Sequence, residues 1–391
     1  MHFLFSLSAS ALLLLAQPQF ARAERAAKLL LQAEQLKIYQ FQDDNSDCAN
    51  SGSNTALKIK QLLGSGSIIE KDFKTLIGKS LPLIEQTGLL IFFDRLKSQN
   101  ISNSAFFLRN YPGRSEPALL LDCSLINSHY LAPAIAHELV HYQFRKENIP
   151  SWFEEGVAQT LEFQRGGEHP QNSLISLSAA SEFPSIFDMS RPLKSQLSYP
   201  LSFLFVRYLT DQFSSRGDSH TSSGLIAAML NPDRKLCAGT FWEQMICQGR
   251  IYLTKTKAPP EQIRRFTAKG LLRYFALALT LNHQKFPYYQ ISDWMGSKSD
   301  DRDWAPKDLV LAPGQFIKFS AKNFPEHFKN PDSDVEVYRI LSNKDSFEVI
   351  PHGTKSALEV ENLKALRNFR KDFILVINTS LERKVTTKTH H

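Results

Sequence analysis

The sequence is poor in cysteine and has no long basic run. Only 4 of its 391 residues are cysteine, and no two of them form a C-x-x-C pair, which excludes a zinc site built from cysteines. The net charge of +7 is spread along the chain with no run of five Lys or Arg, so nucleic acid is not an expected partner. No internal repeat is recognisable.

The N-terminus has an apolar stretch too short for a membrane helix. Residues 3–15 are almost all Leu, Phe, Ala and Ser, whereas a membrane helix needs about 20 residues. Ala21-Arg22-Ala23 follows as a small-x-small cleavage pattern. We expect residues 1–23 to be a signal peptide that is removed, which leaves an exported protein, periplasmic or secreted, without stable membrane insertion. The alternative is a buried N-terminal helix.

The four cysteines suit export into an oxidising compartment, where disulfides persist. Three pairings are possible. The spacing favours the pairing of Cys237 with Cys247 and of Cys48 with Cys123. Free buried thiols are the alternative, and the sequence does not decide between them.

Composition and length predict a folded chain with two domains. Apolar residues make up 42% and charged residues 22%, which is ordinary for globular proteins. A single core stops growing at about 250 to 300 residues. We expect an α+β domain over residues 24–295 with a mostly helical C-terminal half, and a small β-sandwich-like domain over residues 300–385.

Hydrophobic periodicity predicts the main elements. The spacing of Leu201, Leu204, Phe205, Tyr208 and Leu209 marks one buried face of a helix. Further helices are expected over residues 24–36, 68–85 and 261–282 and from Pro133 onward. Strands are expected over residues 89–93, 105–109, 118–123, 309–311, 316–319, 335–338, 347–350 and 373–377.

The pattern that indicates chemistry is His137-Glu138-Leu139-Val140-His141 in a helical context. Residues four apart stand on one helical face, so both imidazoles can bind one ion while Glu138 lies beside them. Zinc suits two neutral nitrogens and one further protein ligand, with a fourth position for a water whose pKa it lowers to about 7. The alternative for each histidine is a satisfied residue on a buried helix face.

The third ligand has two candidates, Glu154 and Glu155. Ser151 after Pro150 is a good N-cap, and Ser-x-x-Glu predicts that the Glu154 carboxylate bonds back to the cap. Glu155 has no such local role and is therefore the expected ligand. The linker over residues 145–151 is short, so the second helix must fold back near the first.

These motifs resemble the gluzincin zinc peptidases, the group that includes thermolysin and the zinc aminopeptidases. The resemblance covers about 25 residues: His137-Glu138-x-x-His141, then Trp152-x-x-Glu155-Gly156-x-Ala158. It implies a zincin-like metallopeptidase domain in which His137, His141 and Glu155 bind zinc and Glu138 is the general base. It also implies that a peptide lies along an edge strand, here residues 118–122, and that a later tyrosine or histidine stabilises the oxyanion.

Tyr199, near the start of a helix expected from about Ser198, resembles that oxyanion donor, and His169 is a second candidate. A core-facing tyrosine and a solvated loop histidine are the alternatives. Phe144 and Glu147 stand where the metzincin pattern needs glycine and histidine, which excludes that branch. Gln159 stands where thermolysin-like enzymes have an acid that orients a histidine.

The sequence thus predicts an exported zinc-dependent peptidase, with endopeptidase favoured because the aminopeptidase signature Gly-Ala-Met-Glu-Asn is absent. Its partner would be a peptide or protein substrate. A non-catalytic binding or adhesion protein on a retired peptidase scaffold is the alternative. The oligomeric state stays open.

Overall fold

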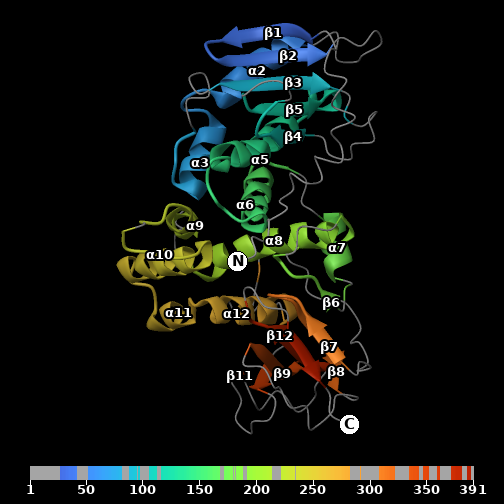
Figure 1. Ribbon diagram of the computed structural model, residues 1–391, viewed down its shortest axis with the longest axis vertical. Helices are drawn as coiled ribbons and strands as arrows, with labels where there is room; N and C mark the ends of the chain where they lie inside the picture. Colours follow the sequence, from blue (N-terminus) through green and yellow to red (C-terminus); the bar gives the residue numbers. More distant parts are fainter. Residues whose placement is uncertain are drawn as a thin grey trace, which may run out of the picture. The chain divides into compact units, whose positions relative to one another are not determined.

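A computed structural model covers the full chain. It describes residues 27–41, 52–81, 88–94, 96, 105–111, 116–167, 171–178, 180, 182–187, 192–213, 222–233, 235–281, 291, 308–321, 334–342, 347–351, 359–361, 371–380 and 385–388. The predicted signal peptide, residues 1–23, lies outside the described residues. Figure 1 shows the elements coloured along the chain.

The chain divides into two compact units, and each contains both helices and strands. The first unit comprises residues 1–169 and 226–233, and the second comprises residues 170–225 and 234–391. The α+β class predicted from the sequence is therefore correct. The predicted domain boundary near residue 300 stays a prediction.

The first unit contains a five-stranded mixed sheet of order β1-β2-β3-β5-β4. Its central strands are buried along their whole length, as expected for continuous apolar runs that pair in parallel. β4 pairs antiparallel with β5 and forms one edge of the sheet. The strands are β1 (Ala27–Ala33), β2 (Leu36–Phe41), β3 (Leu89–Asp94), β4 (Ala105–Leu108) and β5 (Ala118–Asp122).

The helix predicted over residues 24–36 is wrong. Residues 27–33 have a helix-favouring composition, but they pair with β2 through a turn in which Glu34 has a positive φ of 49°. β2 alternates buried and half-buried residues and adds in parallel to β3. Sheet pairing therefore overrides the local propensity of this segment.

Helices α2 (Gly52–Leu63), α3 (Ile68–Ile77), α5 (Leu131–Phe144) and α6 (Ser151–Gln164) complete the first unit together with the end of α9 (Ser222–Leu230). α3 ends at Gly78, which has a positive φ of 72°. A Cβ at this position would lie only 2.7 Å from the Cβ of Ala227, so both the backbone and the packing require glycine. Asn231 then donates to the Ile77 carbonyl at 2.7 Å. Residues 226–233 therefore pack on the end of α3.

α5 lies against the edge strand β4, and α6 folds back beside α5 (Figure 1). Tyr142 of α5 fixes this placement, since its ring meets Phe107 of β4 edge-on at 6.0 Å and its hydroxyl donates to the Gly88 carbonyl. The linker between the helices is held by an ion pair of Lys79 with Glu147 at 2.7 Å. The predicted return of the second helix is confirmed.

The second unit contains a helical part in which the predicted stripe of α8 is buried. Its helices are α7 (Gln171–Ser178), α8 (Pro192–Gln212), α10 (Phe241–Lys255), α11 (Pro260–Arg265) and α12 (Ala268–Leu281). The single helix predicted over residues 261–282 is broken. Thr267 starts a new helix there, because its hydroxyl accepts the Gly270 amide at 3.0 Å.

Two antiparallel sheets share a core in the second unit. Leu309 and Leu311 of β7 pack with inward-facing residues of the larger sheet. The larger sheet has the order β11-β10-β9-β12-β8-β6 and the smaller is β13-β7. Their strands are β6 (Glu182–Phe183), β7 (Asp308–Leu311), β8 (Phe316–Ser320), β9 (Val335–Ser342), β10 (Phe347–Pro351), β11 (Glu359–Glu361), β12 (Lys371–Asn378) and β13 (Val385–Lys388).

Residues 182–187 join this sheet although they precede it by more than 120 residues in the chain. β6 pairs with β8, and the rings of Phe183 and Phe316 stack at 4.4 Å. The Ser185 hydroxyl donates to the Pro313 carbonyl. This pairing has no signal in the sequence, and it explains why the second compact unit begins near residue 170.

The predicted disulfide between Cys237 and Cys247 is confirmed. Cys123 is also disulfide-bonded, and no described cysteine is free. Cys48, its predicted partner, lies outside the described residues. Disulfides are typical of oxidising compartments. None of the helices that the structure describes has both the length and the apolar character required to span a membrane.

The ion pair between Arg273 of α12 and Glu336 of β9 should stabilise the second unit. Arg273 donates to both carboxylate oxygens, at 2.7 and 2.5 Å, and both side chains are largely buried. Arg273→Met leaves Glu336 without this partner, so we expect unfolding to become easier by about 2 kcal/mol. Urea denaturation measures the difference.

The matched control is Arg339→Met, which breaks the more exposed Arg339–Asp372 pair of the same sheet. This change should cost less than about 1 kcal/mol. An equal decrease in the free energy of unfolding for the two variants would contradict the prediction.

Candidate metal centre

α5 places His137 and His141 on the face of the helix that meets α6. The two residues are four apart, and their ring centroids are 5.3 Å apart. They are half-buried, whereas ten of the fourteen residues of α5 are buried. The apolar remainder of α5 therefore anchors the helix, and the two imidazoles stand on its more open face.

Glu155 of α6 faces both imidazoles. Its Oε2 lies 3.5 Å from Nε2 of His137, and its Oε1 lies 3.6 Å from Nε2 of His141. Donor atoms of the three residues lie within 4.8 Å of one another. The structure thus brings together the three ligands predicted from the sequence as a group that could hold a metal ion.

The spacing of these donors fits a small tetrahedral ion. Metal–ligand bonds of about 2.0 to 2.1 Å place tetrahedral donors about 3.3 Å apart. The two nitrogen-to-carboxylate distances of 3.5 and 3.6 Å, which run to different oxygens of Glu155, are close to that value. Two imidazole nitrogens and one carboxylate oxygen are also ligands that transition metals prefer over Ca²⁺ or Mg²⁺.

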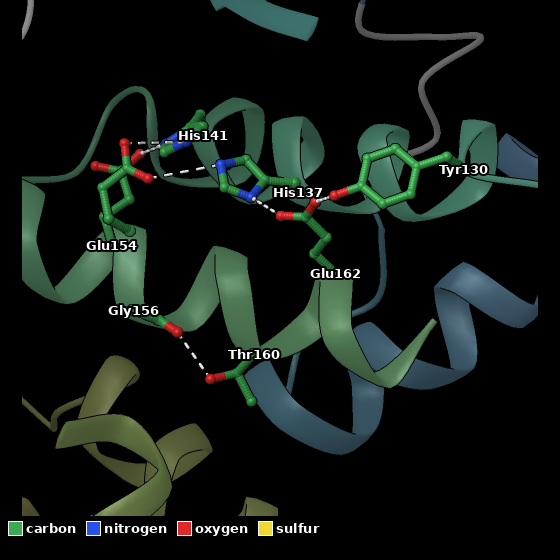
Figure 2. Close-up of polar contacts among 8 residues, drawn as sticks. Tyr130, His137, His141, Glu154, Gly156, Thr160 and Glu162 are labelled. Carbon is green, nitrogen blue, oxygen red and sulfur yellow. Dashed lines mark hydrogen bonds and ion pairs between the residues drawn. The ribbon is translucent and has the colours of Figure 1, made fainter. Parts of the chain in front are cut away.

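Each histidine has a second carboxylate behind it (Figure 2). Nδ1 of His137 is 2.7 Å from Oε2 of Glu162, and Nδ1 of His141 is 2.8 Å from Oε1 of Glu154. An ionised carboxylate only accepts hydrogen bonds, so each Nδ1 carries the proton and each Nε2 is left to bind a metal. Both tautomers are therefore set for metal binding.

The role predicted for Glu154 is wrong. α6 begins at Ser151 with Pro150 as its N-cap, and no side chain caps this end. Glu154 is instead buried against His141. The capping pattern was misleading because a glutamate in the first turn of α6 faces the metal-binding face of α5.

Glu162 was not predicted at all. It lies seven residues after Glu155, so both side chains project from the same face of α6 two turns apart. Gln159, the position that the family resemblance favoured, is half-buried and makes no polar contact with either histidine in the described part of the chain. Helical spacing from Glu155 was the signal that identifies Glu162.

The charges of this site call for a cation. Glu138, Glu154, Glu155 and Glu162 surround two histidines, and among the described residues none of these glutamates pairs with Lys or Arg. Buried carboxylates are costly without a counter-charge. With both imidazoles neutral, a divalent ion supplies the positive charge that the protein itself does not.

The pKa values of the two histidines reflect that need. Burial lowers the pKa of His141, but the charge of Glu155 and the hydrogen bond to Glu154 outweigh it and raise the pKa to about 9. Burial likewise lowers the pKa of His137, yet Glu155 and Glu162 hold it well above its usual value. The histidines therefore take up protons when no metal neutralises the carboxylates.

Glu138 has the opposite balance. Burial raises the pKa of its carboxyl, and the two histidines only partly offset this. Its side chain is buried at the same helical turn as His137 and His141. A carboxylate with a raised pKa is a better proton acceptor near neutral pH.

The two predicted oxyanion donors are not tested by this geometry. Tyr199 lies inside α8 of the second unit rather than at a helix start, because α8 begins at Pro192. It is half-buried, and its role stays a prediction. His169 lies outside the described residues.

The chain was compared with protein-family models and with curated proteins. No protein-family model matches it, and no curated protein is similar to it in sequence. The residues of the site therefore carry the functional argument alone.

The metal-free chain should lose stability as the pH rises from about 6.5 to 9. The raised pKa of His141 means that its protonated form stabilises the fold fully below 6.5, and this contribution disappears as the pH passes 9. Urea unfolding of chelator-treated protein at several pH values measures it. The control is the variant His129→Asn at an exposed histidine, whose stability should fall with pH as that of the unaltered chain does. Constant stability over this range would contradict the assignment.

Glu154→Ala should weaken metal binding by about 10- to 100-fold, because the His141 ring loses the partner that fixes it. Competition with a chromophoric chelator measures the dissociation constant. Gln159→Ala, on the same helix, is the control and should bind metal as the unaltered chain does. If both variants bind equally well, Glu154 does not orient His141.

Proposed function

We propose that this protein is a zinc-dependent peptidase, with endopeptidase as the favoured type. The observation that carries the proposal is the placement of Glu138 beside a His137–His141–Glu155 group whose donors could hold a metal ion. Metal binding alone needs only the three ligands. Hydrolysis also requires a general base, and Glu138 is a buried carboxylate with a raised pKa next to these ligands.

The residues divide the chemistry among them. His137, His141 and Glu155 would hold zinc, which when bound polarises a carbonyl and makes water acidic. Glu138 takes a proton from the attacking water and returns it to the leaving amine. Glu154 and Glu162 keep the imidazoles in the tautomer that binds metal.

The substrate would be an extended peptide added to the edge of the first sheet. The edge predicted from the sequence, residues 118–122, is wrong because β5 pairs on both sides, with β3 and β4. β4 is the edge strand on this side, and α5 packs against it. Main-chain pairing with β4 would therefore bring a peptide beside the helix that carries Glu138.

The proposal includes the gluzincin resemblance, the zincin-like fold and export. Two features support the resemblance: a second helix supplies the third ligand, and an acidic residue orients the first histidine. That acid is Glu162, which contacts Nδ1 of His137, rather than the residue at position 159. The Cys237–Cys247 disulfide supports export to the periplasm or beyond.

Glu138→Gln should abolish hydrolysis while zinc stays bound, because the amide does not accept a proton. We expect cleavage of a fluorogenic unfolded-protein substrate to fall by at least about 100-fold. Glu116→Gln, just before β5, is the matched control and should cleave normally. Unimpaired cleavage by Glu138→Gln refutes the mechanism, and peptide binding without cleavage by the unaltered chain favours the adhesion alternative.

A further inference from the structure

Tyr130 stands directly before α5, next to the metal site but outside its ligands. Its backbone is fixed on both sides: its amide donates to the Ser128 hydroxyl at 3.0 Å, and its carbonyl accepts the Ala134 amide at 3.0 Å. The side chain is half-buried. The start of α5 thus holds this tyrosine in a defined place seven residues before His137.

The Tyr130 hydroxyl donates to Oε1 of Glu162, and Oε2 of the same carboxylate lies 2.7 Å from Nδ1 of His137 (Figure 2). Glu162 therefore uses its two oxygens for two different partners. The series of hydrogen bonds from Tyr130 through Glu162 to His137 thus begins in the turn before α5 and ends at a proposed metal ligand.

The two orienting carboxylates differ in how they are held. Glu154 is buried and lies in the first turn of α6, next to the ligand Glu155. Glu162 lies near the end of α6, and its side chain is 18% exposed, twice the 9% of Glu154. A glutamate with three side-chain torsions at a partly open position needs a partner to stay against His137.

We propose that Tyr130 is a positioning residue that locks Glu162 against His137 and so sets the affinity of the site for its metal. This inference rests on the proposed function only for the identity of the metal. It does not require that the protein hydrolyse peptides. Tyr130 acts through Glu162 and touches neither the metal nor a substrate.

The test is a double-mutant cycle on the affinity for zinc, measured by competition with a chromophoric chelator. Tyr130→Phe removes one hydroxyl, and we expect about 3- to 10-fold weaker binding. Glu162→Gln should weaken binding by about 10- to 100-fold, because an amide that donates to Nδ1 forces the proton onto Nε2. In the double variant, Tyr130→Phe should add nothing, since the carboxylate through which it acts is gone.

Tyr39→Phe is the matched control, because it removes the hydroxyl of a half-buried tyrosine of β2 that stacks on Phe92 and, in the described part of the chain, contacts neither α5 nor α6. It should leave zinc affinity unchanged. The thermal stability of the Tyr130→Phe variant without zinc distinguishes a positioning role from a merely structural one. A merely structural role would lower this stability without changing the affinity for zinc. The visible spectrum of the cobalt-substituted protein gives a second readout of the geometry around His137.

Two results overturn the inference. In the first, Tyr130→Phe binds zinc within twofold of the unaltered chain. In the second, Tyr130→Phe weakens zinc binding equally in the unaltered chain and in the Glu162→Gln variant. If the unaltered chain binds no zinc, both the inference and the proposed function fail. If it binds zinc tightly but cleaves no peptide, only the proposed function fails.

Discussion

Four carboxylates around two imidazoles are the constraint on which the site depends. Glu138, Glu154, Glu155 and Glu162 lie within reach of His137 and His141, and no Lys or Arg in the described part of the chain pairs with these glutamates. Such a cluster is stable only with positive charge in its middle. Two protons on the histidines supply it in the metal-free chain, and a divalent ion supplies it otherwise.

The helix pair meets this constraint with simple spacing. On α5, the two histidines are four positions apart; on α6, Glu154 and Glu155 are adjacent and Glu162 lies two turns further on. Helical periodicity thus places Glu155 between the two histidines and gives each histidine a further carboxylate at its Nδ1. The packing of Tyr142 against β4 and Gly88 fixes α5, so the site is built on a rigid element rather than on a loop.

The sequence predicted the three residues that the structure brings together as a group that could hold a metal ion, because their placement depends on local spacing. His137, His141 and Glu155 follow from two helices and a short linker, and the buried stripe of α8 and most strands of the second unit follow from periodicity. Glu154 was misread because a capping pattern and a metal-facing turn look alike in sequence. Tyr130 was missed because its contact with Glu162 joins residues 32 positions apart. Glu162 was missed although its seven-residue spacing from Glu155 places it on the same face of α6. The strands β1, β2, β6, β11 and β13 were also not predicted from the sequence. β1 and β6 become strands only through tertiary pairing.

Metal analysis of the purified chain tests the central claim most directly. The account predicts one equivalent of zinc per chain, lost in Glu155→Ala and retained in the control variant Glu116→Ala. Protein that is purified metal-free and takes up no zinc, or a zinc content that Glu155→Ala leaves unchanged, would contradict it.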